Sequence, residues 1–194
     1  DLRAHLGHQY RRRAADAAQL GTRNYAWRFR TRNEPIAFVD RVLGRQSCSV
    51  RQLLGDFVVA KGDGSPAYQL AVVVDDHEMQ ISEVVRGDDL LPSAFRQLEL
   101  YELFGWQPPR FIHVPLVVGE DGRRLAKRHG DTRLATLRDN GTRSEQLIGL
   151  LAQSCGLRPP AESISARELL ASFDWSRVSR EKFVFTAAMC DSLG

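Results

Sequence analysis

The stretch Phe111–Gly130, FIHVPLVVGEDGRRLAKRHG, carries the most informative local signals in the chain. Its first eight residues are mostly apolar and predict a short buried strand over Phe111–Val118. Gly119–Gly122 predicts a turn, and the run Arg124–Gly130, which we call the basic loop, follows it. A basic loop directly after a buried strand can close over phosphate groups, where a lysine acts as a compact charge on a flexible stem. A short basic stretch is also typical of a solvated surface loop, so these residues alone leave both interpretations open.

Upstream of this stretch, strand and helix signals alternate along the chain. Ala67–Val74 (AYQLAVVV) is largely apolar, and its periodicity does not distinguish a strand from a helix. The other local signals predict a helix at Ala14–Leu20, strands at Trp27–Phe29 and Ile36–Phe38 with a turn at Asn33–Pro35, a strand at Asp56–Ala60, a turn at Lys61–Pro66, a strand at Ile81–Val85 and a helix at Pro92–Phe104 before Gly105.

Downstream of residue 130 the pattern becomes helical. The expected helices are Thr132–Asn140, Ser144–Cys155, Ser165–Phe173 and Ser179–Ser192. The order of strands and helices therefore predicts an α/β fold that carries a helical appendage.

Composition excludes several classes of protein. The chain has 194 residues, of which 43% are hydrophobic, and it contains no apolar run of about 18 residues, so no membrane span is expected. Its cysteines, Cys48, Cys155 and Cys190, are too far apart in sequence to suggest a disulfide framework or a metal site, which favours a reducing, cytoplasmic protein. A net charge of +3 permits binding to nucleic acid.

The basic loop resembles the KMSKS loop of class I aminoacyl-tRNA synthetases, in the KLSKRHG form typical of the glutamyl enzymes. Arg124 stands in place of the first lysine and Ala126 in place of the serine, while Lys127 keeps the second lysine. The resemblance implies that the loop binds ATP and that Lys127 is the catalytic residue meeting its phosphates. The implied ATP-binding residues are Arg124, Leu125, Ala126, Lys127 and Arg128.

Two further segments resemble the same family. Tyr68–Asp76 (YQLAVVVDD) is similar to its YxLAxVVDD segment, and Val84–Leu91 (VVRGDDLL) is similar to its VIRGxDLL segment. The resemblance implies that Tyr68 and Arg86 hold the amino acid glutamate. A guanidinium can grip a carboxylate with two parallel hydrogen bonds, and a tyrosine hydroxyl can bind the polar head of an amino acid.

Each of these two residues has an ordinary structural alternative. Tyr68 could be an aromatic residue of a core, and Arg86 could form a salt bridge with Asp88 or Asp89. The match of both segments together favours the binding role.

The resemblance extends over nearly the whole chain and implies three regions. Ala26–Gly44 contains AWRFR and FVDRVLG, which are similar to the strands of the family's acceptor-binding insertion. We therefore expect an insertion region over residues 1–55, the second half of a Rossmann-type catalytic domain over 56–130, and a helical tail over 131–194.

Some features of the family pattern are missing from the sequence. The HIGH motif is absent, because His5-Leu6-Gly7-His8 lies in a polar stretch with no strand before it. The chain opening at Asp1 is therefore expected to be a fragment, and residues 1–194 alone are not expected to activate glutamate. Many relatives hold zinc near the region matching residues 1–25, but no cysteine precedes Cys48, so neither zinc nor another resident metal is predicted.

The resemblance implies ATP-dependent activation of L-glutamate, with Mg²⁺ accompanying ATP, followed by transfer to tRNA. Only Asp131–Gly194 follows the basic loop, and LLASFDWSRVS around Leu170–Val178 resembles the closing segment of glutamyl-Q-tRNA(Asp) synthetases, which predicts queuosine as the acceptor. Transfer to the tRNA 3′ end is the first alternative, and a non-catalytic tRNA-binding relative is the second. A monomer with no membrane partner is expected.

Overall fold

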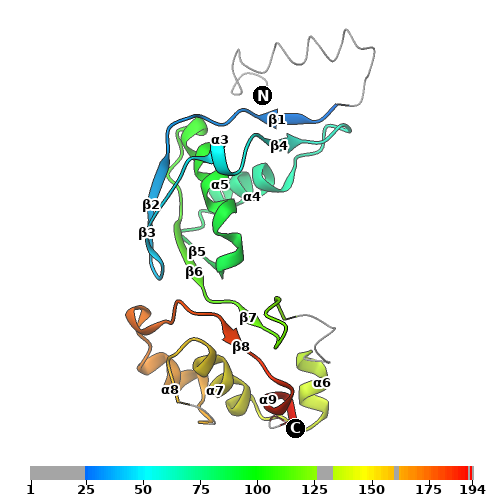
Figure 1. The fold of residues 1–194 in the computed structure, drawn as a ribbon, viewed down its shortest axis with the longest axis vertical. Helices are drawn as coiled ribbons and strands as arrows, with labels where there is room; N and C mark the ends of the chain where they lie inside the picture. The colour runs from blue at the N-terminus through cyan, green and yellow to red at the C-terminus, as the bar shows by residue number, and fades with distance from the viewer. Residues whose placement is uncertain (1–24, 126–132, 160–161, 192, 194) are drawn as a thin grey trace. The chain divides into compact units, whose positions relative to one another are not determined.

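The computed structural model describes residues 25–125, 133–159, 162–191 and 193. The expected helix at Ala14–Leu20 lies outside these ranges. Figure 1 shows the described elements, which in chain order are β1 (Trp27–Phe29), β2 (Ile36–Asp40), β3 (Gly44–Cys48), α3 (Val50–Leu53), β4 (Phe57–Ala60), α4 (Tyr68–Glu78), β5 (Glu83–Gly87), η1 (Asp88–Leu90), α5 (Leu91–Phe104), β6 (Arg110–Val114), β7 (Val117–Val118), α6 (Leu134–Asp139), α7 (Ser144–Ser154), α8 (Ala166–Ala171), η3 (Trp175–Arg177), β8 (Phe183–Val184) and α9 (Ala187–Asp191).

The chain divides into two compact units. The first comprises Asp1–Val85 and Leu90–Ile112, and the second comprises Arg86–Asp89 and His113–Gly194. These units reflect packing and do not test the expected regions 1–55, 56–130 and 131–194, which stay a prediction.

The main core of the first unit lies between a strand pair and two helices. β1 pairs antiparallel with β4, and α4 packs against both β4 and α5. The segment whose periodicity was ambiguous is helical, because α4 buries Leu70 and Val73, three residues apart on one face. The buried members of this core are Phe29, Phe57, Val59, Leu70, Val73, Leu100 and Tyr101.

A second cluster of the first unit lies under the hairpin β2–β3. Its buried residues are Ile36, Cys48, Val50 and Phe95. The turn of the hairpin is held by the buried Asp40, whose Oδ1 accepts hydrogen bonds from the backbone N–H groups of Val42 and Leu43, both at 2.9 Å. The strands expected near Trp27 and Ile36 are confirmed, but they do not pair with each other, because β1 pairs with β4 and β2 pairs with β3.

The expected turn at Lys61–Pro66 and the expected helix before Gly105 are confirmed. The backbone N–H of Gly64 donates to the carbonyl of Lys61 at 2.9 Å. α5 has a proline in its first turn and ends at Gly105 with φ of 66°, a left-handed conformation that favours glycine. The strand expected at Ile81–Val85 begins two residues later, because Ile81 N–H is used to close the end of α4 on the carbonyl of Asp76 at 2.8 Å.

Two expectations for the second unit were wrong. The single strand expected over Phe111–Val118 is divided into β6 and β7 at Pro115, which has no N–H to donate to a strand ladder. The helix expected over Ser179–Ser192 contains β8, which pairs in parallel with β7, and only α9 is helical. The N–H groups of Phe183 and Phe185 donate to the carbonyls of Leu116 and Val118 at 2.9 and 2.8 Å.

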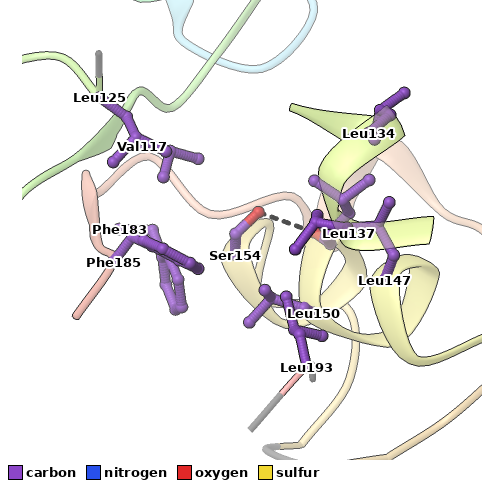
Figure 2. A pocket seen from close by; sticks show the side chains of 11 residues that line it. Val117, Leu125, Leu134, Leu137, Leu147, Leu150, Ser154, Phe183, Phe185 and Leu193 are labelled. Atoms are coloured by element: carbon purple, nitrogen blue, oxygen red, sulfur yellow. Dashed lines mark hydrogen bonds between the residues drawn. The ribbon is translucent and has the colours of Figure 1, made fainter. Parts of the chain in front are cut away.

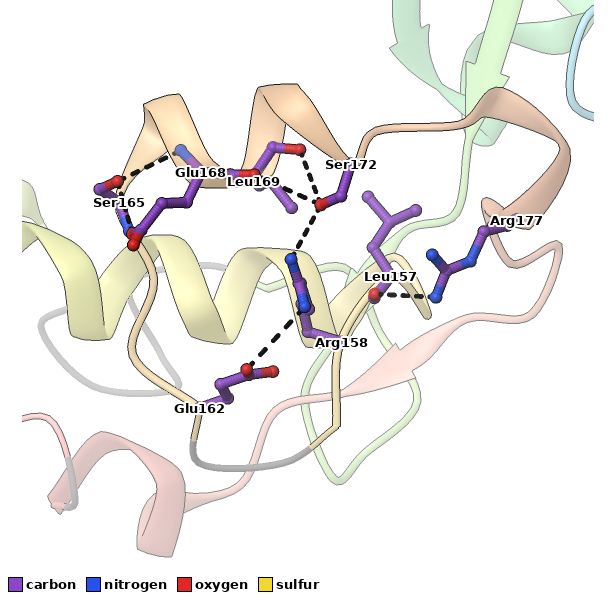
Figure 3. Close-up of polar contacts among 8 residues, drawn as sticks. All are labelled: Leu157, Arg158, Glu162, Ser165, Glu168, Leu169, Ser172 and Arg177. Carbon is purple, nitrogen blue, oxygen red and sulfur yellow. Dashed lines mark hydrogen bonds and ion pairs between the residues drawn. The ribbon is translucent and has the colours of Figure 1, made fainter.

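The helices expected near Thr132–Asn140, Ser144–Cys155 and Ser165–Phe173 are present in shorter form as α6, α7 and α8. Ser165 and Glu168 form a reciprocal capping box at the start of α8, drawn in Figure 3. Arg158, which lies shortly after the end of α7, donates a hydrogen bond to Ser172 Oγ at 2.8 Å, and its Nη1 lies 3.9 Å from Oε1 of Glu162. These polar contacts fasten α8 to the chain segment that follows α7.

None of the helices in the described ranges is long and apolar enough to cross a membrane.

Candidate functional site

Arg86 lies near the C-terminal end of β5, on a strand paired with β6. Its side chain is half-buried, and its Nε donates a hydrogen bond to Nε2 of His113 at 3.1 Å. His113 stands on β6 and is 0% exposed. The guanidinium is therefore attached to a fully buried acceptor at the end of a strand, which is the place where open α/β sheets bind ligands.

The turn after Arg86 depends on Gly87. A Cβ at this position would lie 2.7 Å from Oδ1 of Asp89 and 3.0 Å from Cδ2 of Leu116. Asp89 in turn forms an ion pair with Arg124, with Nη1 and Oδ2 separated by 3.1 Å. A larger residue at position 87 would therefore push against one partner of that ion pair.

The start of the basic loop is fixed by backbone hydrogen bonds to β7. Leu125 N–H donates to the carbonyl of Val117 at 3.0 Å, and Gly119 N–H donates to the carbonyl of Arg123 at 2.9 Å. This geometry confirms the expected turn at Gly119–Gly122. Arg124 projects from the start of the basic loop, and 72% of its side chain is exposed.

The remaining implied ATP-binding residues, Ala126, Lys127 and Arg128, lie outside the described residues, so their roles stay predictions.

An apolar pocket of about 200 Å³ lies beneath the stem of the basic loop within the second unit. Figure 2 shows Leu125 and Val117 on one side of it, with Leu137, Leu147 and Leu150 facing them from α6 and α7. The full lining is Val117, Leu125, Leu134, Leu137, Leu147, Leu150, Leu151, Ser154, Phe183, Phe185 and Leu193. The side chains that line the pocket are almost all apolar. Their contacts hold the start of the basic loop against α6 and α7.

Tyr68 belongs to the first unit, whereas Arg86, Arg124 and Leu125 belong to the second. It is the first residue of α4 and is 61% exposed. The neighbouring Gln69 ties α4 to α5, since its Nε2 donates to Ser93 Oγ at 3.0 Å. The exposure excludes the interpretation of Tyr68 as a core aromatic in the described structure and leaves its hydroxyl accessible.

The arginines of the first strands have protein partners of their own. Arg28 donates to the backbone carbonyl of Asp56, and Arg32 pairs with Glu102. Arg30 is exposed. Contacts of this kind are common for exposed arginines at the edge of a sheet. They do not by themselves indicate a surface that binds nucleic acid.

No group of three or more His, Cys, Asp or Glu side chains in residues 25–125 or the later described segments is arranged to hold a metal ion. The region where relatives were expected to bind zinc, near residues 1–25, falls almost wholly outside these segments.

Sequence reasoning did not identify His113 or the pairing of Asp89 with Arg124. The available signal for His113 was its position as the single ionisable residue inside the apolar run FIHVPLVV. From the sequence, Asp89 was expected only as a possible partner of Arg86. Its partner in the structure is Arg124, which is 35 residues away in sequence and is brought near Asp89 after the chain reverses at the Gly119–Gly122 turn.

Comparisons with known proteins agree with this architecture. The family model for the catalytic domain of class I tRNA synthetases (E and Q) matches residues 8–191. A glutamyl-Q tRNA(Asp) synthetase from Rhodopirellula baltica is 46% identical over 173 residues, covering 82% of this chain and 53% of that protein. The same-named protein of Nocardia farcinica is 47% identical, covering 83% and 49%. Glutamate--tRNA ligase 2 of Halorhodospira halophila is 40% identical, covering 81% and 34%.

Among solved structures, a glutamate tRNA ligase from Elizabethkingia meningosepticum in complex with its amino acid gives a TM-score of 0.76 at 29% identity. The match covers 94% of this chain and 40% of that one. This chain thus spans about half the length, or less, of the curated relatives it matches. The likeness confirms the expected α/β fold class, and with the family match it shows that the chain belongs to the catalytic-domain family of the class I glutamyl and glutaminyl tRNA synthetases.

Proposed function

We propose that the protein containing this chain activates L-glutamate with ATP and transfers the glutamyl group to tRNA. The observation that carries this proposal is the family match over residues 8–191 together with relatives of 46–47% identity that are named for glutamyl transfer to tRNA. In the first step, a carboxylate oxygen of glutamate attacks the α-phosphorus of ATP, giving glutamyl-adenylate and pyrophosphate. In the second, a hydroxyl of the RNA takes the acyl group and AMP leaves.

The residues of this chain serve that chemistry by binding and orientation. Arg86, held at the end of β5, grips a carboxylate of glutamate through charge-assisted hydrogen bonds. Tyr68 offers an accessible hydroxyl for the polar head of the amino acid.

The basic loop carries Lys127 toward the phosphates of ATP, where a positioned charge stabilises the developing negative charge. Mg²⁺ accompanies ATP, as it does generally in class I synthetases. No protein nucleophile is needed, so catalysis rests on positioning and electrostatics.

We further propose queuosine in tRNA(Asp) as the acceptor. Two relatives at 46% and 47% identity are named glutamyl-Q tRNA(Asp) synthetases, whereas one named glutamate--tRNA ligase shares 40% identity. The segment LLASFDWSRVS, which forms the end of α8 and η3 here, supports the same branch.

Two measurements test these proposals separately. Glutamate-dependent exchange of pyrophosphate into ATP by the full-length protein tests activation, and its absence in the folded full-length protein would leave the tRNA-binding alternative. Transfer of labelled glutamate to tRNA(Asp) with and without queuosine tests the acceptor. Labelling of tRNA that lacks queuosine, with tRNA(Glu) preferred, would instead assign transfer to the 3′ end.

A further inference from the structure

The hydrogen bond between Arg86 and His113 restricts the protonation state of the histidine. A guanidinium has only N–H donors, so the Nε2 atom that receives its bond at 3.1 Å must present a lone pair. The imidazole is then neutral, with its proton on Nδ1. A protonated imidazole would offer donors at both nitrogens and would place a second positive charge against the guanidinium.

The same bond restricts how Arg86 can meet a carboxylate. A guanidinium can form two parallel bonds either along its side, using Nε and one terminal nitrogen, or at its end, using both terminal nitrogens. Because Nε of Arg86 donates to His113, the arrangement along the side of the group, which uses Nε, is closed to a carboxylate while this bond holds.

His113 is suited to fix this orientation because it cannot follow a moving guanidinium. It lies on β6 at 0% exposure, within a strand run whose neighbours Phe111 and Ile112 are also buried. Arg86 is half-buried on the partner strand β5. An arginine side chain carries about 2 kcal/mol of rotamer entropy, and a rigid acceptor restricts much of that freedom before the ligand arrives.

We propose that His113 is a positioning residue for glutamate recognition: its neutral imidazole accepts from Nε of Arg86 and so holds the guanidinium in one orientation toward a carboxylate of the amino acid. This inference rests on the proposed function, since it assigns the carboxylate to glutamate. It adds a residue that touches no substrate and acts through Arg86.

The kinetic test compares two substitutions at position 113. His113→Gln keeps a side-chain oxygen that can accept from Arg86, whereas His113→Leu is of similar size but has no acceptor. We expect His113→Leu to raise KM for glutamate about tenfold in pyrophosphate exchange, as loss of a charged hydrogen bond predicts, with KM for ATP unchanged. His113→Gln should stay within about threefold of the wild type.

A double substitution separates positioning from general damage. In the Arg86→Ala background, His113→Leu should cause no further rise in KM for glutamate, because the group that it orients is gone. Additive effects of the two substitutions, or equal effects of Leu and Gln at position 113, would overturn the proposal.

A measurement on the unaltered protein keeps the test valid if His113→Leu fails to fold. Nitrogen NMR of protein with ¹⁵N-labelled histidine, assigned with His113→Gln, should show His113 at neutral pH with the proton on Nδ1 and an unprotonated Nε2. A proton on Nε2 would contradict the positioning role. Absence of glutamate-dependent exchange by the full-length wild type would defeat the proposed function instead, while the NMR result would still report on the bond itself.

Discussion

At the scale of single residues, the two arginines of the second unit are held to different degrees. Arg86 is half-buried and bonded to an imidazole at 0% exposure, so its position is defined by the strand pair. Arg124 is 72% exposed and pairs with Asp89, whose side chain is 30% exposed. An exposed ion pair of this kind contributes only about 0–1 kcal/mol. Arg86 is therefore the better candidate for a preorganised binding group, and Arg124 for an adjustable contact at the stem of the basic loop.

Replacement of Arg86 by alanine tests the first role. Loss of a charged hydrogen bond at a half-buried site costs about 1.5–3 kcal/mol, so KM for glutamate should rise at least about tenfold with KM for ATP near normal. Glutamate titration by calorimetry and pyrophosphate exchange both measure this effect. Arg180→Ala, which removes an exposed arginine of the same unit, is the control and should leave glutamate affinity nearly unchanged. Unaltered glutamate affinity in folded Arg86→Ala, with only a lower Tm, would assign Arg86 a structural role.

Lys127 is the residue of the basic loop on which adenylate formation is predicted to depend. Lys127→Ala should slow glutamate-dependent pyrophosphate exchange by about 10²-fold or more, as removal of one preorganised charge typically does. Glutamate affinity should change little. Lys182→Ala, which removes an exposed lysine elsewhere in the same unit, should leave the rate unaltered. Equal rates for the two variants would mean that the basic loop is only a solvated surface.

At the scale of elements, α7 passes so close to the following connection that one of its positions must be glycine. A Cβ at Gly149 would lie 1.9 Å from the backbone carbonyl oxygen of Glu162. Backbone cannot move aside as a flexible side chain can, so the whole connection that leads into α8 would have to shift. Glycine here is therefore required for space and not for its conformational freedom.

The substitution Gly149→Ala tests this close approach, because its expected sign is opposite to the usual one. Alanine inside a helix normally stabilises it relative to glycine by about 1 kcal/mol. Here overpacking should destabilise the protein by about 2–3 kcal/mol. Gly141→Ala is the matched comparison, since Gly141 has φ of 87° with open space around its Cβ position, and it should cost only about 1 kcal/mol. Urea denaturation measures both, and a stabilised Gly149→Ala would disprove the contact.

At the scale of the whole molecule, a buried carboxyl in the first unit makes stability depend on pH. Glu99 on α5 is 5% exposed, and burial raises its pKa above the ordinary value, while the nearby positive charge of Arg32 opposes that rise. The folded protein thus holds the Glu99 proton more tightly than the unfolded chain does. The stability from this group is fully present below the unfolded pKa and is lost as pH rises through the folded pKa.

Glu99→Gln should therefore be more stable than the wild type at neutral pH, and the difference should disappear as the pH falls below about 4. Thermal unfolding of both proteins between acid and neutral pH measures this. Glu168→Gln is the contrasting variant, because hydrogen bonds from Ser165 lower the pKa of Glu168, so its contribution is present above the unfolded pKa and is lost on acidification. A Glu99→Gln protein that is less stable than the wild type at neutral pH would show that Glu99 acts there as an ionised partner of Arg32.

Features that depend on local chemistry and on family motifs could be predicted from the amino-acid sequence. Proline and glycine positions marked the limits of α5 and the turns at Lys61–Pro66 and Gly119–Gly122, because these residues restrict or extend the backbone wherever they occur. The basic loop and the segments around Tyr68 and Arg86 were enough to identify the family, since a motif can be recognised in the sequence even when the contacts of its residues are unknown.

Features that depend on residues far apart in the chain could be recognised only in the folded protein. β8 is a strand because β7, 66 residues earlier, offers its backbone carbonyls, and no local pattern at Phe183 reveals that partner. α4 is a helix because one of its faces is buried against β4 and α5. The acceptor of Arg86 is His113 on the adjacent strand, and Asp89 pairs with Arg124 across 35 residues. Pairing and burial of this kind depend on how the chain returns upon itself, which residue types and spacing do not specify.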